Sequence, residues 1–116
     1  MEQDEYGPND DRSALVISDE VLAAIAVTAA REAEGVSALA PRPPEIARLF
    51  KGEHLRYVKI TRDGDELSVD LALRVRAGTK VTEAASGVQR AVRGALCDMT
   101  EKTVAKVNIK ILGVDP

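Results

Sequence analysis

The sequence has few of the side chains from which catalytic and metal sites are built. Its 116 residues include one cysteine, one histidine and no tryptophan. A single cysteine excludes both a disulfide within the chain and a cysteine-based zinc cluster. A single histidine leaves no second imidazole for a histidine metal site. We therefore interpret Cys97 as a small structural thiol on an apolar helix face, and His54 as a solvated residue of a polar loop.

Motifs for phosphate binding and nucleophilic catalysis are also missing. The sequence contains no GxxxxGK[ST], GxGxxG or GxSxG pattern. The acidic residues Asp63, Asp65 and Glu66 have the composition of a hairpin turn, so we expect exposed carboxylates there and not metal ligands. The sequence therefore predicts a protein that is not an enzyme, and we assign no catalytic, cofactor-binding or metal-binding residue.

The net charge of −3 is unevenly distributed along the chain. Residues 1–13 carry five acidic side chains, one basic side chain and almost no large aliphatic ones. This composition predicts a disordered acidic tail, followed by one domain over residues 14–116. That domain has a net charge near +1, which is unlike the strongly basic character of dedicated nucleic-acid binders.

No segment predicts export or insertion into a membrane. The N-terminus lacks a basic region followed by an apolar one, as a secretory signal would have. The longest apolar stretch, residues 21–30, falls well short of the roughly 20 residues that span a bilayer. We expect a cytoplasmic protein without a direct membrane span.

Two segments have the apolar spacing of amphipathic helices. Ser18 is a suitable N-cap, and the two acidic residues after it favour the first turn of a helix over residues 19–34. Gly35 supplies the stop. Apolar side chains recur at helical spacing over residues 81–99 and predict a second, longer helix, for which Thr79 is the expected cap.

The strands are predicted from short apolar runs and from alternation. Residues 15–17 form an apolar run suited to a first strand, and residues 57–61 and 67–76 alternate on either side of an acidic turn, as in a hairpin. Residues 107–111 alternate as a last strand. Between them, residues 36–54 have no regular pattern beyond one helical turn at 45–50, where Phe50 is suited to pin the loop to the core. Burying both helices on one sheet face gives an α+β fold: a small, mostly antiparallel sheet with two amphipathic helices packed on one face.

The outward face of this predicted sheet carries mainly basic side chains, with Asp70 as the one acid. Two interpretations stay open: a solvated face, or a contact surface for an acidic protein partner or a phosphate backbone. The acidic tail could also fold back over this face. The candidate partner surface comprises Tyr57, Lys59, Arg74, Arg76, Lys106, Asn108 and Lys110.

Three separated groups of residues resemble the alkaline shock protein family, the envelope stress response proteins of mostly Gram-positive bacteria. The resemblance covers about residues 14–114. Two positions depart from the family pattern: Arg76 and Ala77 precede Gly78 where a Tyr-Gly pair is usual, and Glu101 stands where glycine often follows the Met-Thr pair. The matching residues are 17–22, 25–26, 29–30 and 34–36, then 88–92 and 99–100, and finally 107–114.

The resemblance implies a non-enzymatic, cytoplasmic, envelope-associated protein that self-associates and is held at the membrane by a separate anchor protein. The leading hypothesis is thus an envelope stress response protein that acts as a membrane-associated scaffold or interaction domain, with protein partners. The alternative is a nucleic-acid-binding module that uses the basic sheet face. It is less favoured, because Tyr57 is the one aromatic side chain there on which a base could stack and no KH-type GxxG loop is present.

Overall fold

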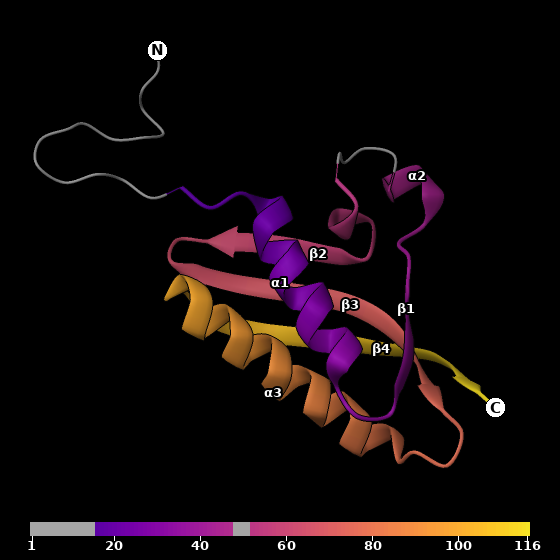
Figure 1. Ribbon diagram of the computed structural model, residues 1–116. Helices are drawn as coiled ribbons and strands as arrows, with labels where there is room; N and C mark the ends of the chain where they lie inside the picture. The colour runs from indigo at the N-terminus through magenta and orange to yellow at the C-terminus, as the bar shows by residue number, and fades with distance from the viewer. Residues whose placement is uncertain (1–15, 48–51) are drawn as a thin grey trace, which may run out of the picture.

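The computed structural model describes residues 16–47 and 52–116 of the chain (Figure 1). The predicted acidic tail at 1–13 and the predicted role of Phe50 therefore lie outside the described residues. In chain order the elements are α1 (Asp19–Glu32), β1 (Val36–Ala40), α2 (Pro44–Ala47), the 3-10 turn η2 (His54–Arg56), β2 (Val58–Asp63), β3 (Glu66–Arg76), α3 (Val81–Thr100) and β4 (Thr103–Asp115).

The sheet is organised around its long central strand, β3. Strand β2 pairs antiparallel with residues 66–71 of β3, and β1 pairs antiparallel with residues 72–75, so β1 and β2 lie end to end along one edge. Strand β4 runs parallel to β3 along the other edge. The parallel pair arises because α3 carries the chain back across the sheet before β4 begins.

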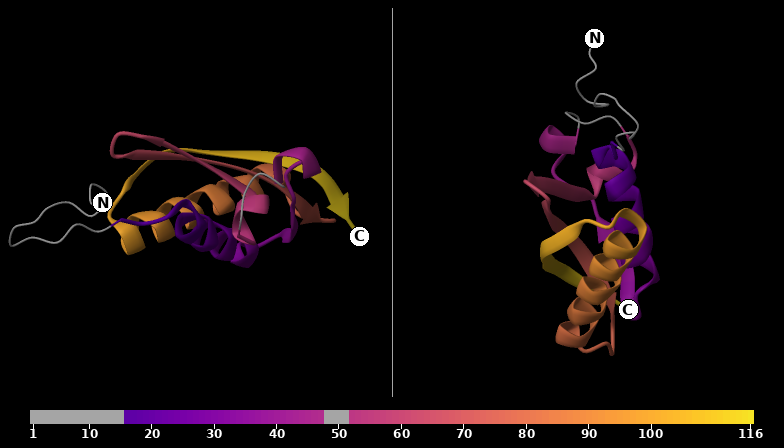
Figure 2. Two further views of the ribbon diagram at one scale, coloured as in Figure 1. Left: turned by 90° about the horizontal axis from the view of Figure 1, so that it is seen from above. Right: turned by 90° about the vertical axis from the view of Figure 1, so that its left-hand side faces the viewer.

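The core fills one face of this sheet. The side chains of β3 alternate as predicted, and Leu67, Val69, Leu71, Leu73 and Val75 are all buried. Helices α1 and α3 lie together on this side of the sheet, as the view from above shows (Figure 2). Burying each large aliphatic side chain of this layer contributes roughly 1.5–3 kcal/mol before entropy is subtracted. The predicted α+β architecture is confirmed.

The helix ends follow the predicted signals in part. Ser18 caps α1, because its Oγ accepts a hydrogen bond from the Val21 N–H at 3.2 Å. The predicted end of this helix at residue 34 is two residues too late, because α1 ends at Glu32 and Ala33 is its C-cap. Gly35 lies in the turn after the helix with a φ of +87°, a conformation that glycine adopts without strain. The prediction of Thr79 as the cap of α3 is wrong: Lys80 occupies the N-cap position, and the Thr79 side chain lies against Gly35 instead.

Two further predictions are corrected. Val16 and Ile17 are not in a strand, because β3 already has partners along both edges and leaves no edge for them. The Ile17 carbonyl instead accepts a hydrogen bond from the Arg62 guanidinium at 2.5 Å. The segment expected to be irregular contains strand β1, which is held in the sheet by the burial of Val36 and Leu39.

Candidate functional site

The candidate partner surface lies on the sheet face opposite α1 and α3. Within it, Lys59, Asp70 and Asn108 are neighbours on β2, β3 and β4, because each is paired with the next in the strand register. The Asn108 amide donates a hydrogen bond to the Asp70 carboxylate at 2.8 Å. Lys59, Asn108 and Lys110 are exposed. The structure therefore brings residues from three strands onto one uncovered face, as the sequence pattern predicted.

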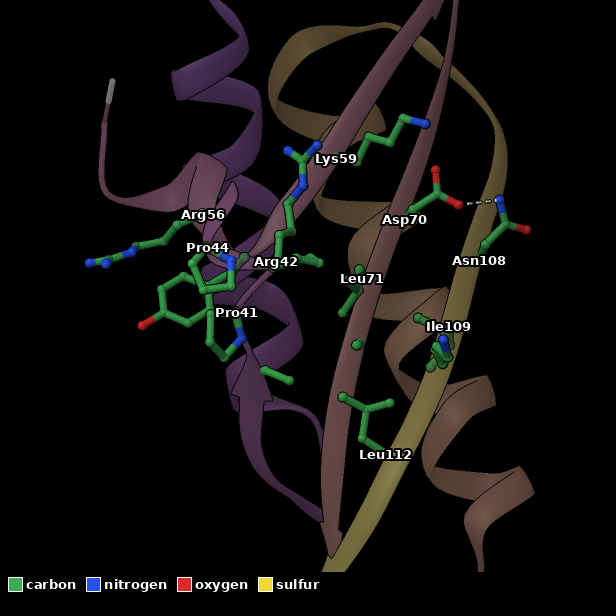
Figure 3. A pocket seen from close by; sticks show the side chains of 15 residues that line it. Pro41, Arg42, Pro44, Arg56, Lys59, Asp70, Leu71, Asn108, Ile109 and Leu112 are labelled. Atoms are coloured by element: carbon green, nitrogen blue, oxygen red, sulfur yellow. Dashed lines mark hydrogen bonds between the residues drawn. The ribbon is translucent and has the colours of Figure 1, made fainter. Parts of the chain in front are cut away.

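Four of the seven predicted residues line one hollow of about 730 Å³ on this face: Tyr57, Lys59, Asn108 and Lys110. Figure 3 shows the hollow between Pro41, Pro44 and Arg56 on one side and Asn108, Ile109 and Leu112 on the other. The other three predicted residues do not line it. Lys106 is exposed on β4 and Arg76 is exposed at the end of β3. Arg74 forms an ion pair with Asp115.

Small side chains create the floor of the hollow. Ala40 of β1 pairs with Ala72 of β3, and neither fills the space above the sheet. The wall is the proline-rich segment that follows β1. It is fixed by Arg42, whose backbone N–H donates to the Arg56 carbonyl at 2.7 Å and whose side chain donates to the Leu55 carbonyl at 3.2 Å. Sequence reasoning missed this wall, although three prolines after a short apolar run were a visible signal of a fixed segment.

Arg74 is part of a polar cluster that joins three strands. Its guanidinium pairs with Asp115 of β4, with Nε 2.9 Å from Oδ1, and the Ser37 hydroxyl of β1 donates to Oδ2 of the same carboxylate at 2.6 Å. The hydrogen bonds from Arg74 and Ser37 lower the pKa of Asp115, and Asp115 in turn raises the pKa of Arg74. Arg74 therefore has a carboxylate partner within the chain, which the sequence analysis did not identify.

One face of the Tyr57 ring is covered by another side chain. The Arg31 guanidinium of α1 lies over this ring, 5.1 Å from its centroid. Such a cation–π contact covers one of the two ring faces on which a nucleic-acid base could stack. The alternative of a nucleic-acid-binding module therefore stays a less favoured prediction.

His54 is not the solvated residue that the sequence suggested. Its Nδ1 lies 2.5 Å from Oε2 of Glu20, and its backbone N–H donates to the same oxygen at 3.3 Å. The first turn of α1 places Glu20 over η2, a contact across 34 positions of sequence. Burial opposes ionisation of Glu20, but hydrogen bonds from the His54 side chain and backbone, together with the charge of a protonated His54, outweigh it and lower the pKa of Glu20.

The Glu20–His54 contact predicts a particular acid sensitivity. Because the folded state lowers the pKa of Glu20, its stabilising contribution is present above the pKa of an unfolded glutamate, about 4.3, and is lost as the pH falls through the folded value. As the pH falls below about 5, the free energy of unfolding should therefore decrease less steeply in Glu20→Gln than in the natural chain, as measured by urea unfolding at several pH values. Glu53→Gln, which removes an exposed neighbouring carboxylate, should retain the natural slope. Equal slopes for the natural chain and Glu20→Gln would contradict the assignment.

The other candidate residues have ordinary surroundings. Cys97 is half-buried and packs against the core. Asp63, Asp65 and Glu66 are exposed around the hairpin turn. In the part of the chain that the structure describes, no group of three or more His, Cys, Asp or Glu side chains could hold a metal ion.

Comparison with known proteins identifies the family to which the chain belongs. Residues 7–116 match the model of the alkaline shock protein 23 family, which is described as having a cell envelope-related function. The chain belongs to this family. The resemblance found in the sequence is thereby confirmed.

Relatives of this alkaline shock protein family member occur in Gram-positive bacteria. The uncharacterized protein YqhY of Bacillus subtilis (strain 168) is 30% identical over 100 residues, which cover 84% of this chain and 74% of YqhY. The uncharacterized protein YloU of the same organism is 29% identical over 102 residues, covering 84% and 85%. The uncharacterized protein Spy1535 of Streptococcus pyogenes serotype M6 (strain ATCC BAA-946 / MGAS10394) is 30% identical over 104 residues, covering 86% and 78%.

Solved structures support the fold. Two structures of MamM-CTD superpose with a TM-score of 0.53 at 16% and 17% identity, covering 83% of this chain and 99% and 98% of theirs. At this identity the likeness concerns the fold alone. Among the helices within residues 16–47 and 52–116, none combines the length and the hydropathy needed to cross a bilayer.

Proposed function

We propose that this member of the alkaline shock protein family is a non-enzymatic scaffold or interaction domain of the envelope stress response, and that its uncovered sheet face binds a protein partner. One observation carries the proposal. Helices α1 and α3 cover one face of the sheet, while the opposite face combines a hollow with exposed lysines from two strands. The family description gives a cell envelope-related function and names no reaction.

The proposal includes the place of action. We propose that the chain works in the cytoplasm and reaches the membrane through a membrane-anchored protein partner, with self-association as a second mode of assembly. Both modes need an exposed contact face, and the sheet face provides one. Arg74 is paired with Asp115 on this face, so Arg56, Lys59 and Lys110 around the hollow offer positive charge to a partner.

Site-specific photo-crosslinking in the native host tests the proposal. A photo-crosslinking residue at Lys110 should give a covalent adduct with another protein, and the adduct should appear in the membrane fraction if the partner is anchored. An adduct with twice the 12.4 kDa mass of the chain would report self-association. The same residue at Arg90, exposed on α3, is the matched control and should give no such adduct.

The charge on the face provides a second comparison. Adding Lys59→Glu to the Lys110 crosslinker should weaken the adduct, whereas adding Arg90→Glu on α3 should leave it unchanged. Equal adducts from Lys110 and Arg90 crosslinkers, or none from Lys110, would contradict the assignment of this face.

A further inference from the structure

We infer that the hollow on the uncovered sheet face binds an extended peptide that combines carboxylates with apolar side chains. This inference rests on the proposed function, because it names the chemistry of the partner that would bind there. We call this hollow the peptide groove, defined by its lining residues: Ala40–Pro44, Arg56, Tyr57, Lys59, Asp70–Ala72, Asn108–Lys110 and Leu112.

The floor of the peptide groove is apolar. Ala40 and Ala72 are small and adjacent, and Leu112 stands beside them with 49% of its surface exposed. Leu112 continues the outward alternation of Asn108 and Lys110 along β4. It is the extra residue of a bulge, because Leu73 pairs with Ile111 and Arg74 pairs with Gly113, so it has no partner on β3. A large hydrophobic residue is therefore left uncovered at the groove. Apolar side chains of a ligand would gain by burial against this floor.

The rim of the peptide groove is basic. Arg56, Lys59 and Lys110 are exposed, and no carboxylate of the described residues pairs with them. Asp70 is the one acid among the lining residues. The three exposed cations and this carboxylate give the rim a net charge of about +2, and a ligand with carboxylates is electrostatically complementary to it.

The shape of the peptide groove favours an extended chain. Lys59 and Lys110 lie on β2 and β4, with β3 between them, so they flank the floor about 10 Å apart across the strands. Residues 108–112 of β4 run about 16 Å along it, the length of five extended residues. A flat bilayer surface does not fill such a concavity.

The wall of the peptide groove is ordered before a ligand binds. Prolines restrict the segment from Pro41 to Pro44, and the backbone and side chain of Arg42 donate to the carbonyls of Arg56, Leu55 and Val58. A pre-ordered wall lowers the entropy lost on binding, so a short peptide can bind a site of this size.

Fluorescence polarisation with the full chain tests the inference. The probe is a labelled seven-residue peptide in which aspartate and leucine alternate, and its counterpart replaces each aspartate with lysine. We expect the acidic peptide to bind, its affinity to fall as salt is raised, and the basic peptide not to bind. Ala72→Leu, which fills the floor, and Lys59→Glu/Lys110→Glu, which reverses the rim, should each reduce the affinity about tenfold or more.

Arg90→Glu is the matched control. Arg90 is exposed on α3, which packs on the opposite face of the sheet, and it does not line the groove. The substitution should change the affinity less than about twofold, since exposed charges outside a contact are largely screened. Thermal unfolding of each variant establishes that the fold is retained; the rim variant alters exposed side chains, so it tests the inference even if Ala72→Leu fails to fold.

Four results would overturn the inference: no binding of the acidic peptide, equal binding of the basic peptide, unchanged affinity in the rim variant, or an equal loss in Arg90→Glu. Binding to phosphatidylglycerol vesicles without binding of the acidic peptide would assign the groove to a lipid surface instead. The two proposals fail separately. If Lys110 crosslinks to a protein but the acidic peptide does not bind, the proposed function stands and the assignment of the groove is wrong. If the peptide binds but Lys110 crosslinks to no protein in the host, the groove binds such peptides and the proposed function is wrong.

Discussion

Leu73→Ala should lower the free energy of unfolding by about 3–5 kcal/mol. Leu73 is fully buried at the centre of β3, where it pairs with Leu39 of β1 and Ile111 of β4. Truncation removes three carbon atoms from the layer between the sheet and the two helices, and strands on both edges restrict collapse around the cavity. Urea unfolding followed by circular dichroism measures the change.

Leu112→Ala provides the control for this substitution. It makes the same chemical change one strand away, at a side chain that is half exposed on the other face. Its cost should stay within about 0.5 kcal/mol, as for most surface substitutions. A similar cost for the two variants would show that β3 is not the centre of the core.

Gly35→Ala should destabilise the fold by about 2–4 kcal/mol, through two separate causes. Gly35 has a φ of +87°, which an alanine adopts only with strain. In addition, a Cβ at this position would lie 2.5 Å from Cγ2 of Thr79. Because Thr79 is branched at Cβ and lies in the turn before α3, it has little freedom to move away.

Gly78→Ala separates the two causes. Gly78 has nearly the same φ, +90°, but an added Cβ there would meet no atom within 4 Å. Gly78→Ala should lower the free energy of unfolding by about 1–2 kcal/mol. This loss is smaller than that of Gly35→Ala, because no contact like the one with Thr79 is made. Thr79→Ser removes Cγ2 and should recover part of the loss in the Gly35→Ala background, as a double-mutant cycle in urea would report. Equal costs at the two glycines, or no recovery, would contradict the contact.

Local patterns were enough to predict the main elements. The strict alternation along β3, the Ser18 cap of α1 and the apolar stripe of α3 each reflect interactions among residues close in sequence, and each was found in the predicted place. The buried part of the stripe is shorter than predicted: Val81 and Met99 at its two ends are 41% and 69% exposed, and the buried residues of α3 lie between Ala84 and Leu96. The basic character of the uncovered face was also readable from alternation, since β4 alternates lysine and asparagine with aliphatic residues.

Contacts between distant segments could not be predicted. Strand β1 was missed because five residues of ordinary composition become a strand when the edge of β3 lies beside them. Glu20 and His54 are 34 positions apart, and Arg74 and Asp115 are 41 apart, so no local sequence pattern predicts either contact. The candidate residues of the strands lie on one uncovered face, but Arg74 has an internal partner, and Arg42 and Arg56, which line the hollow, were not included. That this face binds a partner stays a prediction.

The sequence by itself determined the α+β class, the two amphipathic helices, the face of β3 that enters the core and membership of the alkaline shock protein family. These properties follow from periodicity and helix caps, which are local, and from similarity along the chain. Tertiary structure alone decided that Ala40 and Ala72 meet, that Leu112 stands beside them without a partner on β3, and that the proline segment forms a wall over them. The groove depends on which strands pair and in which register, and those choices are made by burial across the whole core and not by any short stretch of residues.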